Sequence, residues 1–408
     1  MDGTSPMIPG LEDPPLTAPE PPIVTARHTL VLLPEVEAML RSFFGDVGRA
    51  RRRVFVECYI LLDDKLGRML GEALVKAVTQ GASVRLIYDP LGSHLASEAF
   101  FEELRANGVD VRSYRPAATM PGPGTIFPRD HSRIMVVDDT AYTGGAAWAD
   151  PWLPKAWGGE GWHDVCVRAE GPCVEDFARV FEQRWREANA EVATPRDIDT
   201  REMYPDLRLV ADTTSRASLV EQFHRAAIQR AKKRVWMENA YFFPSTAMLK
   251  DLYEAAARGV DVQIMLAGET DLPILRCAAR SEFLAWIEHG MTLWEYQGRV
   301  LHAKFAVIDD EWCTIGTFNA NPSSMALVNE INLFVFDPAF VGRAAGLFEK
   351  DIRSCKAVTA EEVRDLSLLT KAGDAIANNA ISILDATLSS DSDARHPNAD
   401  DDGLEREG

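Results

Sequence analysis

The chain has 408 residues, of which 46% are hydrophobic and 26% charged, as is usual for a globular protein with two ordinary domains or one large one. Its formal net charge of -19 counts against a general nucleic-acid-binding protein, because such a long-range field repels polyanions. Apolar runs stay short of the ~18 residues that a transmembrane helix needs. The N-terminus lacks the basic start and apolar core of a signal peptide. We therefore expect a cytoplasmic protein, free or attached to a membrane surface.

Acidic segments without stable structure are expected at both ends. Residues 1–26 are rich in proline and carry four acids and no base, and residues 391–408 carry seven acids against two arginines. The six cysteines show no C-x-x-C pair and no clustering with histidine, which favours buried free thiols over zinc ligands or a disulfide framework. The composition therefore gives no reason to expect a metal.

Helices and strands alternate through the first half of the chain. Arginines 51–53 lead into a β-branched and aromatic strand, and glycine 81 stops the helix before the next strand. The expected order is a helix at 34–49, a strand at 54–60, a helix at 66–79, a strand at 83–89, a helix at 97–106 and a short strand at 109–111.

The second half repeats this order. A basic lead and strand at 232–238 are followed by a helix at 248–258 and a strand at 259–266. Self-similarity of this length predicts a duplicated fold. We expect two α/β domains, residues 27–200 and 201–358, each a mixed β-sheet covered by helices. One or two further helices are expected at 359–390, where an amphipathic pattern favours packing on the core over membrane contact.

Chemistry-bearing residues recur at one place in each repeat. The segment Leu301–Asp309 reads as a strand with His302 and Lys304 on one face, and a less regular copy runs from His131 to Asp138. In both copies the aspartate falls seven residues after the histidine (131 to 138, 302 to 309). Two such copies predict one active site built from two halves.

The histidine segments resemble the paired H-x-K-x4-D motifs of the phospholipase D superfamily. The segments 281–304, 319–324, 329–333 and 162–165 look like bacterial cardiolipin synthases, and the resemblance covers about residues 50–352. It implies two phospholipase D-like domains with the active site at their interface. It also implies phosphatidyl transfer through a phosphohistidine, without metal or another cofactor. The motif residues implied as catalytic are His131, Arg133, Asp138, His302, Lys304 and Asp309.

The chemistry of a phosphodiester agrees with these residues. Lys304 and Arg133 would supply positive charge to its non-bridging oxygens, with Thr317 and Asn319 as further donors. Imidazole titrates near neutrality, so one histidine can attack phosphorus while the other protonates the leaving alcohol. By resemblance His131 is the nucleophile and His302 the acid and base.

Carboxylates of two kinds accompany the histidines. The odd seven-residue offset turns Asp138 and Asp309 to the opposite strand face, so we expect them to orient the strand end and turn. Glu330 and Asp164 are the better candidates for holding the imidazole rings, because a carboxylate on the far ring nitrogen stabilises the imidazolium form.

The first copy departs from the family pattern. Arg133 replaces the usual lysine, which keeps the charge but adds bulk. The step from Asp138 to Gly144 is one residue shorter than that from Asp309 to Gly316. Either Ala147 or Trp148 stands where an asparagine is expected.

The function predicted is that of a cardiolipin synthase-like phosphatidyltransferase, joining phosphatidylglycerol to a second phospholipid at the inner face of the cell membrane. No nucleic-acid partner is expected. A hydrolytic phospholipase D, a nuclease and a non-catalytic binding module remain alternatives. Aromatic residues at 148–157 could pack in a loop or meet acyl chains.

Overall fold

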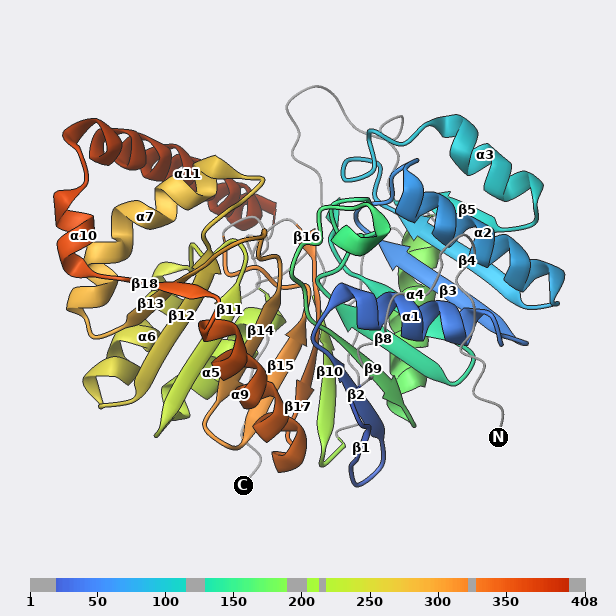
Figure 1. The fold of residues 1–408 in the computed structure, drawn as a ribbon, viewed down its shortest axis with the longest axis horizontal. Helices are drawn as coiled ribbons and strands as arrows, with labels where there is room; N and C mark the ends of the chain where they lie inside the picture. The colour runs from blue at the N-terminus through green and yellow to red at the C-terminus, as the bar shows by residue number, and fades with distance from the viewer. Residues whose placement is uncertain (1–19, 115–128, 189–203, 213–217, 322–327, 396–408) are drawn as a thin grey trace.

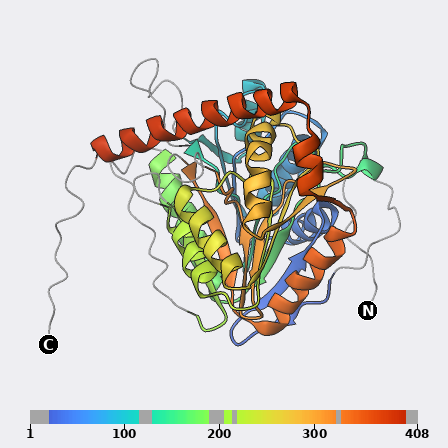
Figure 2. The same ribbon diagram turned by 90° about the vertical axis from the view of Figure 1, so that its left-hand side faces the viewer.

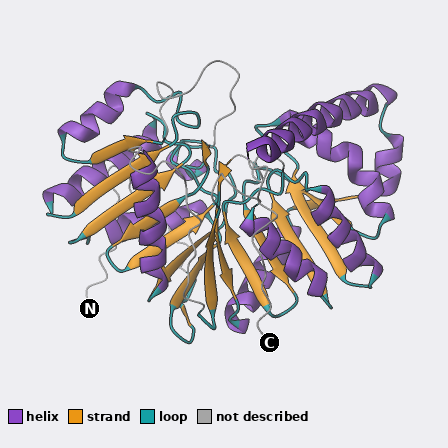
Figure 3. Ribbon diagram, turned by 180° about the vertical axis from the view of Figure 1, so that it is seen from behind, coloured by secondary structure: helices purple, strands orange, loops and turns teal. Residues whose placement is uncertain are grey.

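The computed structural model describes residues 20–114, 129–188, 204–212, 218–321 and 328–395, and the side chains of these residues up to 382. Two β-sheets stand side by side, each with helices on its outer face (Figures 1 and 3). Of the expected acidic ends, residues 1–19 and 396–408 lie outside the described residues.

The first sheet has eight strands within the described residues, in the order β1-β2-β9-β8-β7-β3-β4-β5. Strands β3, β4 and β5 run parallel and the other neighbours antiparallel. Their bounds are β1 (Ile23–Val24), β2 (Thr29–Leu33), β3 (Arg53–Cys58), β4 (Ser83–Tyr88), β5 (Asp110–Ser113), β7 (Ile134–Val137), β8 (Thr140–Gly144) and β9 (Cys166–Glu170).

The second sheet repeats this topology in the order β10-β17-β15-β14-β11-β12-β13-β18, with β11, β12 and β13 parallel. Its bounds are β10 (Leu207–Ala211), β11 (Arg234–Asn239), β12 (Asp261–Ala267), β13 (Thr292–Tyr296), β14 (Lys304–Ile308), β15 (Trp312–Gly316), β17 (Ile331–Val335) and β18 (Cys355–Val358). The predicted fold class, a duplicated α/β fold with mixed sheets, is therefore confirmed.

The helices follow the sequence pattern closely, since each expected helix is present within a few residues of its predicted ends. Side-chain caps set several starts, as where Asp64 accepts from the backbone N–H of Gly67 at the start of α2. The helices are α1 (Val36–Val47), α2 (Lys65–Thr79), α3 (Glu98–Ala106), α4 (Cys173–Ala188), α5 (Leu219–Arg230), α6 (Thr246–Ala257), α7 (Pro273–Glu288), α9 (Pro338–Ile352), α10 (Ala360–Asp365) and α11 (Leu368–Arg395), with a 3-10 turn η2 (Lys155–Trp157).

One hydrophobic core joins the two domains. It includes residues of both sheets together with Phe177 and Phe181 of α4 and Phe340 and Phe348 of α9. Two further cores lie under α1–α3 and under α5–α7. Because the central core belongs to both halves, burial of its apolar surface holds the two sheets in a fixed relation.

The ends of the chain differ from the expected boundaries. Ile23 and Val24 pair with Thr29 and Leu30, so structure begins before residue 27. At the other end α11 continues to Arg395 and lies along one edge of the molecule, against α7 (Figure 2). All six cysteines are free thiols. No helix in the described ranges is both long and apolar enough to cross a bilayer.

Candidate active site

Two short parallel contacts cross the boundary between the sheets. β6 (Arg129–Asp130) pairs with β16 (Val328–Asn329), and in the equivalent place His163 forms a bridge with Leu301. In each contact the residue directly before a motif histidine, Asp130 or Leu301, pairs with a residue of the opposite half. The two halves are thus joined by backbone hydrogen bonds at the point where the motifs begin.

The backbone of each motif histidine is held by the opposite half. The N–H of His131 donates to the Asn329 carbonyl at 3.0 Å, and that of His302 donates to the His163 carbonyl at 2.7 Å. Position and ring orientation of both histidines therefore depend on the domain interface.

Each imidazole ring also bonds to a carboxylate of the opposite half. His131 Nδ1 lies 3.0 Å from both carboxylate oxygens of Glu330, and His302 Nδ1 lies 2.7 Å from Asp164 Oδ2. The sequence predicted these two carboxylates as partners but did not predict that they cross the interface. A carboxylate at Nδ1 fixes the tautomer, which leaves Nε2 to face a substrate.

The two carboxylates are themselves held in place. The Thr317 hydroxyl donates to Glu330, and the Trp152 indole N–H donates to Asp164 Oδ2 at 3.1 Å. Strand register puts Gly145 in the place of Thr317. A Cβ at Gly145 would lie 2.3 Å from Asp164 Oδ1, so the first half has room only for glycine there.

Two buried cations lie beside the histidines. Lys304 Nζ is 2.9 and 3.0 Å from the ring nitrogens of His302. Arg133 Nη1 donates to the His131 carbonyl at 2.7 Å, while its Nε and Nη2 are buried and have no hydrogen-bond partner among the described residues. Unpaired buried guanidinium donors are costly, and an anionic phosphate oxygen would satisfy them. The arginine of the first motif therefore provides donors that suit a phosphodiester.

Burial and the cations together keep the free site's imidazoles neutral. Burial, followed by Arg133 and Lys304, holds the pKa of His131 well below its usual range. Burial and then Lys304 lower the pKa of His302 to about 4. Burial also lowers the pKa of Lys304 to about 7, although Asp164 opposes this shift. A neutral imidazole with Nε2 unprotonated is the form that can attack phosphorus.

Aromatic side chains enclose His302. The ring centroids of Trp152, Tyr241 and Trp162 lie 4.9, 5.7 and 5.9 Å from that of His302. Trp152 and Trp157 are buried, so ordinary packing rather than membrane contact is the correct interpretation of the aromatic loop. These rings restrict the access of water to one side of the site.

The motif aspartates lie away from the histidines. Asp138 accepts from the backbone N–H groups of residues 51, 52 and 53 at 2.9 to 3.0 Å, and Asp309 accepts from those of residues 232, 233 and 234. Both adopt a left-handed backbone, with φ of 49° and 51°. Their contacts agree with the turn-orienting position expected from the seven-residue offset. The structure therefore does not bring these two residues of the implied catalytic set to the reacting groups.

The strand register also shows which residue of the first half stands at the position equivalent to Asn319. Val137 pairs with Thr140 where Ile308 pairs with Trp312, so the first hairpin is one residue shorter. Gly144 and Gly316 occupy equivalent strand positions, and Ala147 and Asn319 each lie three residues further on. Ala147 rather than Trp148 therefore stands in the place of Asn319. Asn319 is buried, and its Oδ1 has no partner among the described residues. The second half thus has this buried amide oxygen where the first half has the methyl group of Ala147.

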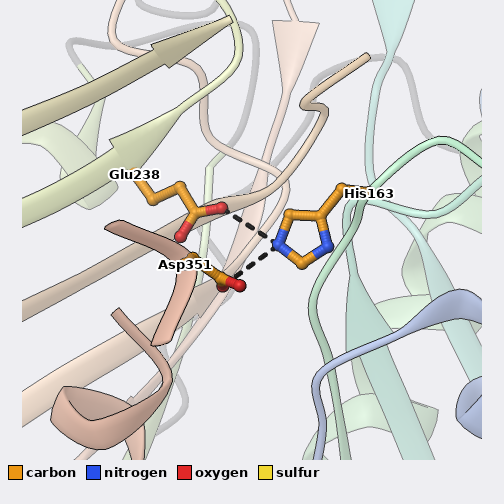
Figure 4. Close-up of side chains that lie close together, drawn as sticks. All are labelled: His163, Glu238 and Asp351. Atoms are coloured by element: carbon orange, nitrogen blue, oxygen red, sulfur yellow. Dashed lines mark hydrogen bonds and ion pairs between the residues drawn. The ribbon is translucent and has the colours of Figure 1, made fainter. Parts of the chain in front are cut away.

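A buried charge cluster beside the site was missed by sequence reasoning. His163 Nε2 lies 3.2 Å from Asp351 Oδ2 and 3.3 Å from Glu238 Oε1 (Figure 4). On its other side Arg299 Nη2 lies 3.2 Å from Nδ1, and Arg299 in turn pairs with Glu35. Burial alone would lower the pKa of His163, but the hydrogen bonds to Asp351, Glu238 and Glu35 raise it well above its usual value.

The other half explains what this cluster is. One nitrogen of His163 and one carboxylate oxygen each of Glu238 and Asp351 lie within 4.8 Å of one another, a spacing that a metal ion could also bridge. By register, however, Glu57 takes the place of Glu238 and Asn329 that of His163, and buried Arg184 interacts with Glu57. Each half thus buries a carboxylate with a cation. The His163 cluster is accordingly an ion cluster between the domains. Aligning the two repeats of the sequence would have indicated it, because Glu57 and Glu238 occupy equivalent positions.

A duplicated α/β fold with one histidine from each half and two buried cations between them defines an enzyme of two-histidine phosphoryl chemistry. The chain belongs to the phospholipase D superfamily, as the family model "Cardiolipin synthase, PLD-like domain" matches residues 46–185 and 225–352.

Comparisons with known proteins agree with this assignment. The chain is 32% identical over 325 residues to cardiolipin synthase B of Salmonella typhi, covering 77% of this chain and 78% of that protein. It is 30% identical over 348 residues to a cardiolipin synthase of Geobacillus kaustophilus, covering 84% and 69%. Its fold is similar to the crystal structure of phosphatidylserine synthase from Haemophilus influenzae, with a TM-score of 0.66, 14% identity and coverage of 88% and 94%.

Proposed function

We propose that this enzyme is a phosphatidyltransferase that forms cardiolipin from phosphatidylglycerol and a second phospholipid. The observation that carries the proposal is the pair of histidines, each bonded at Nδ1 to a carboxylate of the opposite half, around the unpaired donors of Arg133. The names of the relatives at 30–32% identity support the same substrate class. Because its substrates reside in a bilayer, we place the enzyme at the inner face of the cell membrane, attached peripherally.

The reaction would proceed in two displacements. Nε2 of His131 attacks the phosphorus of phosphatidylglycerol, the bond to the glycerol headgroup oxygen breaks, and His302 protonates that oxygen. His302 then takes a proton from the hydroxyl of the second lipid, which attacks phosphorus and releases His131. Arg133 and Lys304 offset the charge on the non-bridging oxygens in both steps.

Several contacts favour His131 as the nucleophile. Its side chain is 12% exposed, against 4% for His302. Its Nδ1 faces Glu330, so the lone pair of Nε2 is directed away from the carboxylate. Lys304 lies close to both ring nitrogens of His302, which makes that ring a poorer attacking group. The bound phosphodiester anion would offset Lys304 and let His302 carry a proton.

Hydrolysis is the competing outcome, because water could resolve the same intermediate. The aromatic enclosure of His302 supports transfer, since it limits water at the atom that activates the acceptor.

A product assay tests the proposal. Purified enzyme is incubated with phosphatidylglycerol vesicles in excess chelator, and the lipids are followed by mass spectrometry for wild type, His131→Ala and His302→Ala. Cardiolipin and glycerol are expected from wild type and neither from the variants. Phosphatidic acid as the main product would identify a hydrolase, and an absence of any product on lipid or DNA would overturn the enzymatic proposal.

A further inference from the structure

Helix α11 contacts α7 through Asp374 and Asn378, buries Ala377 between them, and exposes large aliphatic residues near its start. Asp374 pairs with Arg280 of α7 through two contacts of 2.7 and 2.8 Å, and Asn378 donates to Ser281 and Glu282 of the same helix. The outward residues Leu368, Leu369 and Ile376 are 84%, 87% and 70% exposed. A helix packed on a core usually covers such residues, so these three aliphatic side chains have no contact that accounts for them among the described residues.

Exposed aliphatic residues also occur on two equivalent loops. The connection from β4 to α3 exposes Leu91 and Leu95, and the connection from β12 to α7 together with the first turn of α7 exposes Leu272 and Ile274. Both connections follow the second parallel strand of their sheet, so the duplication places them at corresponding positions. They lie on either side of the midline at the upper edge of the molecule, the edge that α11 also follows (Figures 1 and 2).

A tyrosine ties the first of these loops to the active site. The Ser93 hydroxyl donates to the Tyr59 carbonyl at 3.1 Å. The Tyr59 ring lies 5.0 Å from that of His131. The loop that carries the exposed leucines is therefore bonded to the residue whose ring packs against the proposed nucleophile.

The second loop has the same connection to the other histidine. The Tyr241 hydroxyl donates to Asp271, the residue before Leu272, at 2.6 Å. The Tyr241 ring lies 5.7 Å from that of His302. An apolar rim, Leu91, Leu95, Leu272 and Ile274, thus flanks the histidine pair on both sides. The outward face of α11 extends this rim along the same edge.

We propose that the apolar rim and the outward face of α11 form a docking surface that inserts into the acyl layer of a phospholipid bilayer. The proposal rests on the proposed function, since a two-chain lipid must leave a bilayer to reach the site. Insertion on both sides of the histidines would place the site at headgroup depth. The net charge of -19 repels an anionic surface at long range, so apolar insertion must supply the attraction.

Vesicle binding tests the surface directly. The full chain is mixed with vesicles of phosphatidylglycerol and phosphatidylethanolamine, and the bound fraction is measured by flotation. Each of Leu91→Ser/Leu95→Ser, Leu272→Ser/Ile274→Ser and Leu368→Ser/Leu369→Ser is expected to lower the partition coefficient roughly tenfold or more, as the loss of two inserted aliphatic side chains requires. Added salt should not weaken wild-type binding, because it screens a repulsion between the acidic chain and the anionic lipid.

Val24→Ser is the matched control. Val24 is 78% exposed on β1, at the lower edge in Figure 1, so binding and activity should both stay at wild-type levels. Rim variants that bind vesicles like wild type would overturn the proposal. So would a wild-type dimer that the rim variants convert to monomer with vesicle binding unchanged, because the occupant would then be a second copy of the chain.

An activity measurement separates this surface from the proposed function. On phosphatidylglycerol vesicles the rim variants should lose about tenfold more activity than on dihexanoyl-phosphatidylglycerol dispersed as monomers. Equal losses on both substrates would contradict docking. If wild type transformed neither substrate, the proposed function would fail, whereas the flotation result would still decide whether the surface binds a bilayer.

Discussion

The ion cluster at His163 allows a quantitative prediction for the domain interface. The substitution His163→Asn introduces the residue type found at the equivalent position of the other cluster, Asn329. It leaves Glu238 and Asp351 without the cation that they share. Removing one partner of a buried ion pair costs roughly 3–5 kcal/mol. Burial already raises the pKa of Glu238 to about 7, so this carboxyl can take up a proton and the cost should lie near the lower end. An unfolding entropy of about 2 cal/mol/K per residue gives roughly 1–1.5 °C per kcal/mol for two domains of this size that unfold together, so the melting temperature should fall by roughly 3–5 °C.

The sign of the pH dependence follows from the raised pKa of His163. Its stabilising contribution is complete below the unfolded-state pKa of ~6.5 and is lost as the pH rises through the higher folded-state value. Thermal melts between pH 6 and pH 9 should therefore show the largest gap between wild type and His163→Asn at the acidic end. His163→Asn/Glu238→Gln should recover part of the loss, while exposed His94→Asn should melt like wild type. A gap below 2 °C, or one that widens with pH, would refute the reasoning.

Three further predictions concern the site and its turns. The pKa of Lys304 is lowered to about 7, so in the free enzyme its charge is lost as the pH rises through that value, and kcat/KM should fall. Lys304→Arg should move this alkaline limb of the pH profile up by about one unit or more. A limb that does not move would contradict the role of the Lys304 charge. Glu330→Gln should lower kcat about 10²-fold with little change in KM, because the amide no longer stabilises the His131 imidazolium; steady-state kinetics check this, and a pure KM effect would argue against it. Asp138→Ala should cost about 2 kcal/mol in denaturant unfolding and Asp138→Asn less, since asparagine tolerates the positive φ and still accepts hydrogen bonds; equal losses would count against the turn-holding role.

The sequence predicted local structure well because local patterns determine it. Alternation placed His302 and Lys304 on one face, and the repeated order of helices and strands predicted the duplicated fold. The odd offset of Asp138 from His131 indicated its turn position, which depends only on strand geometry.

Contacts between the halves could not be predicted in this way. The pairing of β6 with β16 joins segments about 200 residues apart, and no periodicity specifies which distant strand end a segment will meet. For this reason the crossing of Glu330 and Asp164 to the opposite histidines was not foreseen.

Exposure was the other weak point of the sequence interpretation. Trp152 and Trp157 suggested a membrane contact but are buried, whereas Leu91 and Leu272 attracted no notice and are exposed. Hydrophobicity alone does not separate a buried aromatic loop from an exposed aliphatic one, because tertiary packing decides which side chains are covered.

The most direct test of the two-half site is to trap its covalent intermediate. Wild-type enzyme is mixed with phosphatidylglycerol, quenched in alkaline denaturant within a single turnover, digested and analysed by mass spectrometry. The account predicts a phosphatidyl group on the peptide that contains His131 and none in His131→Ala. Label on neither histidine, with product still formed, would contradict the account.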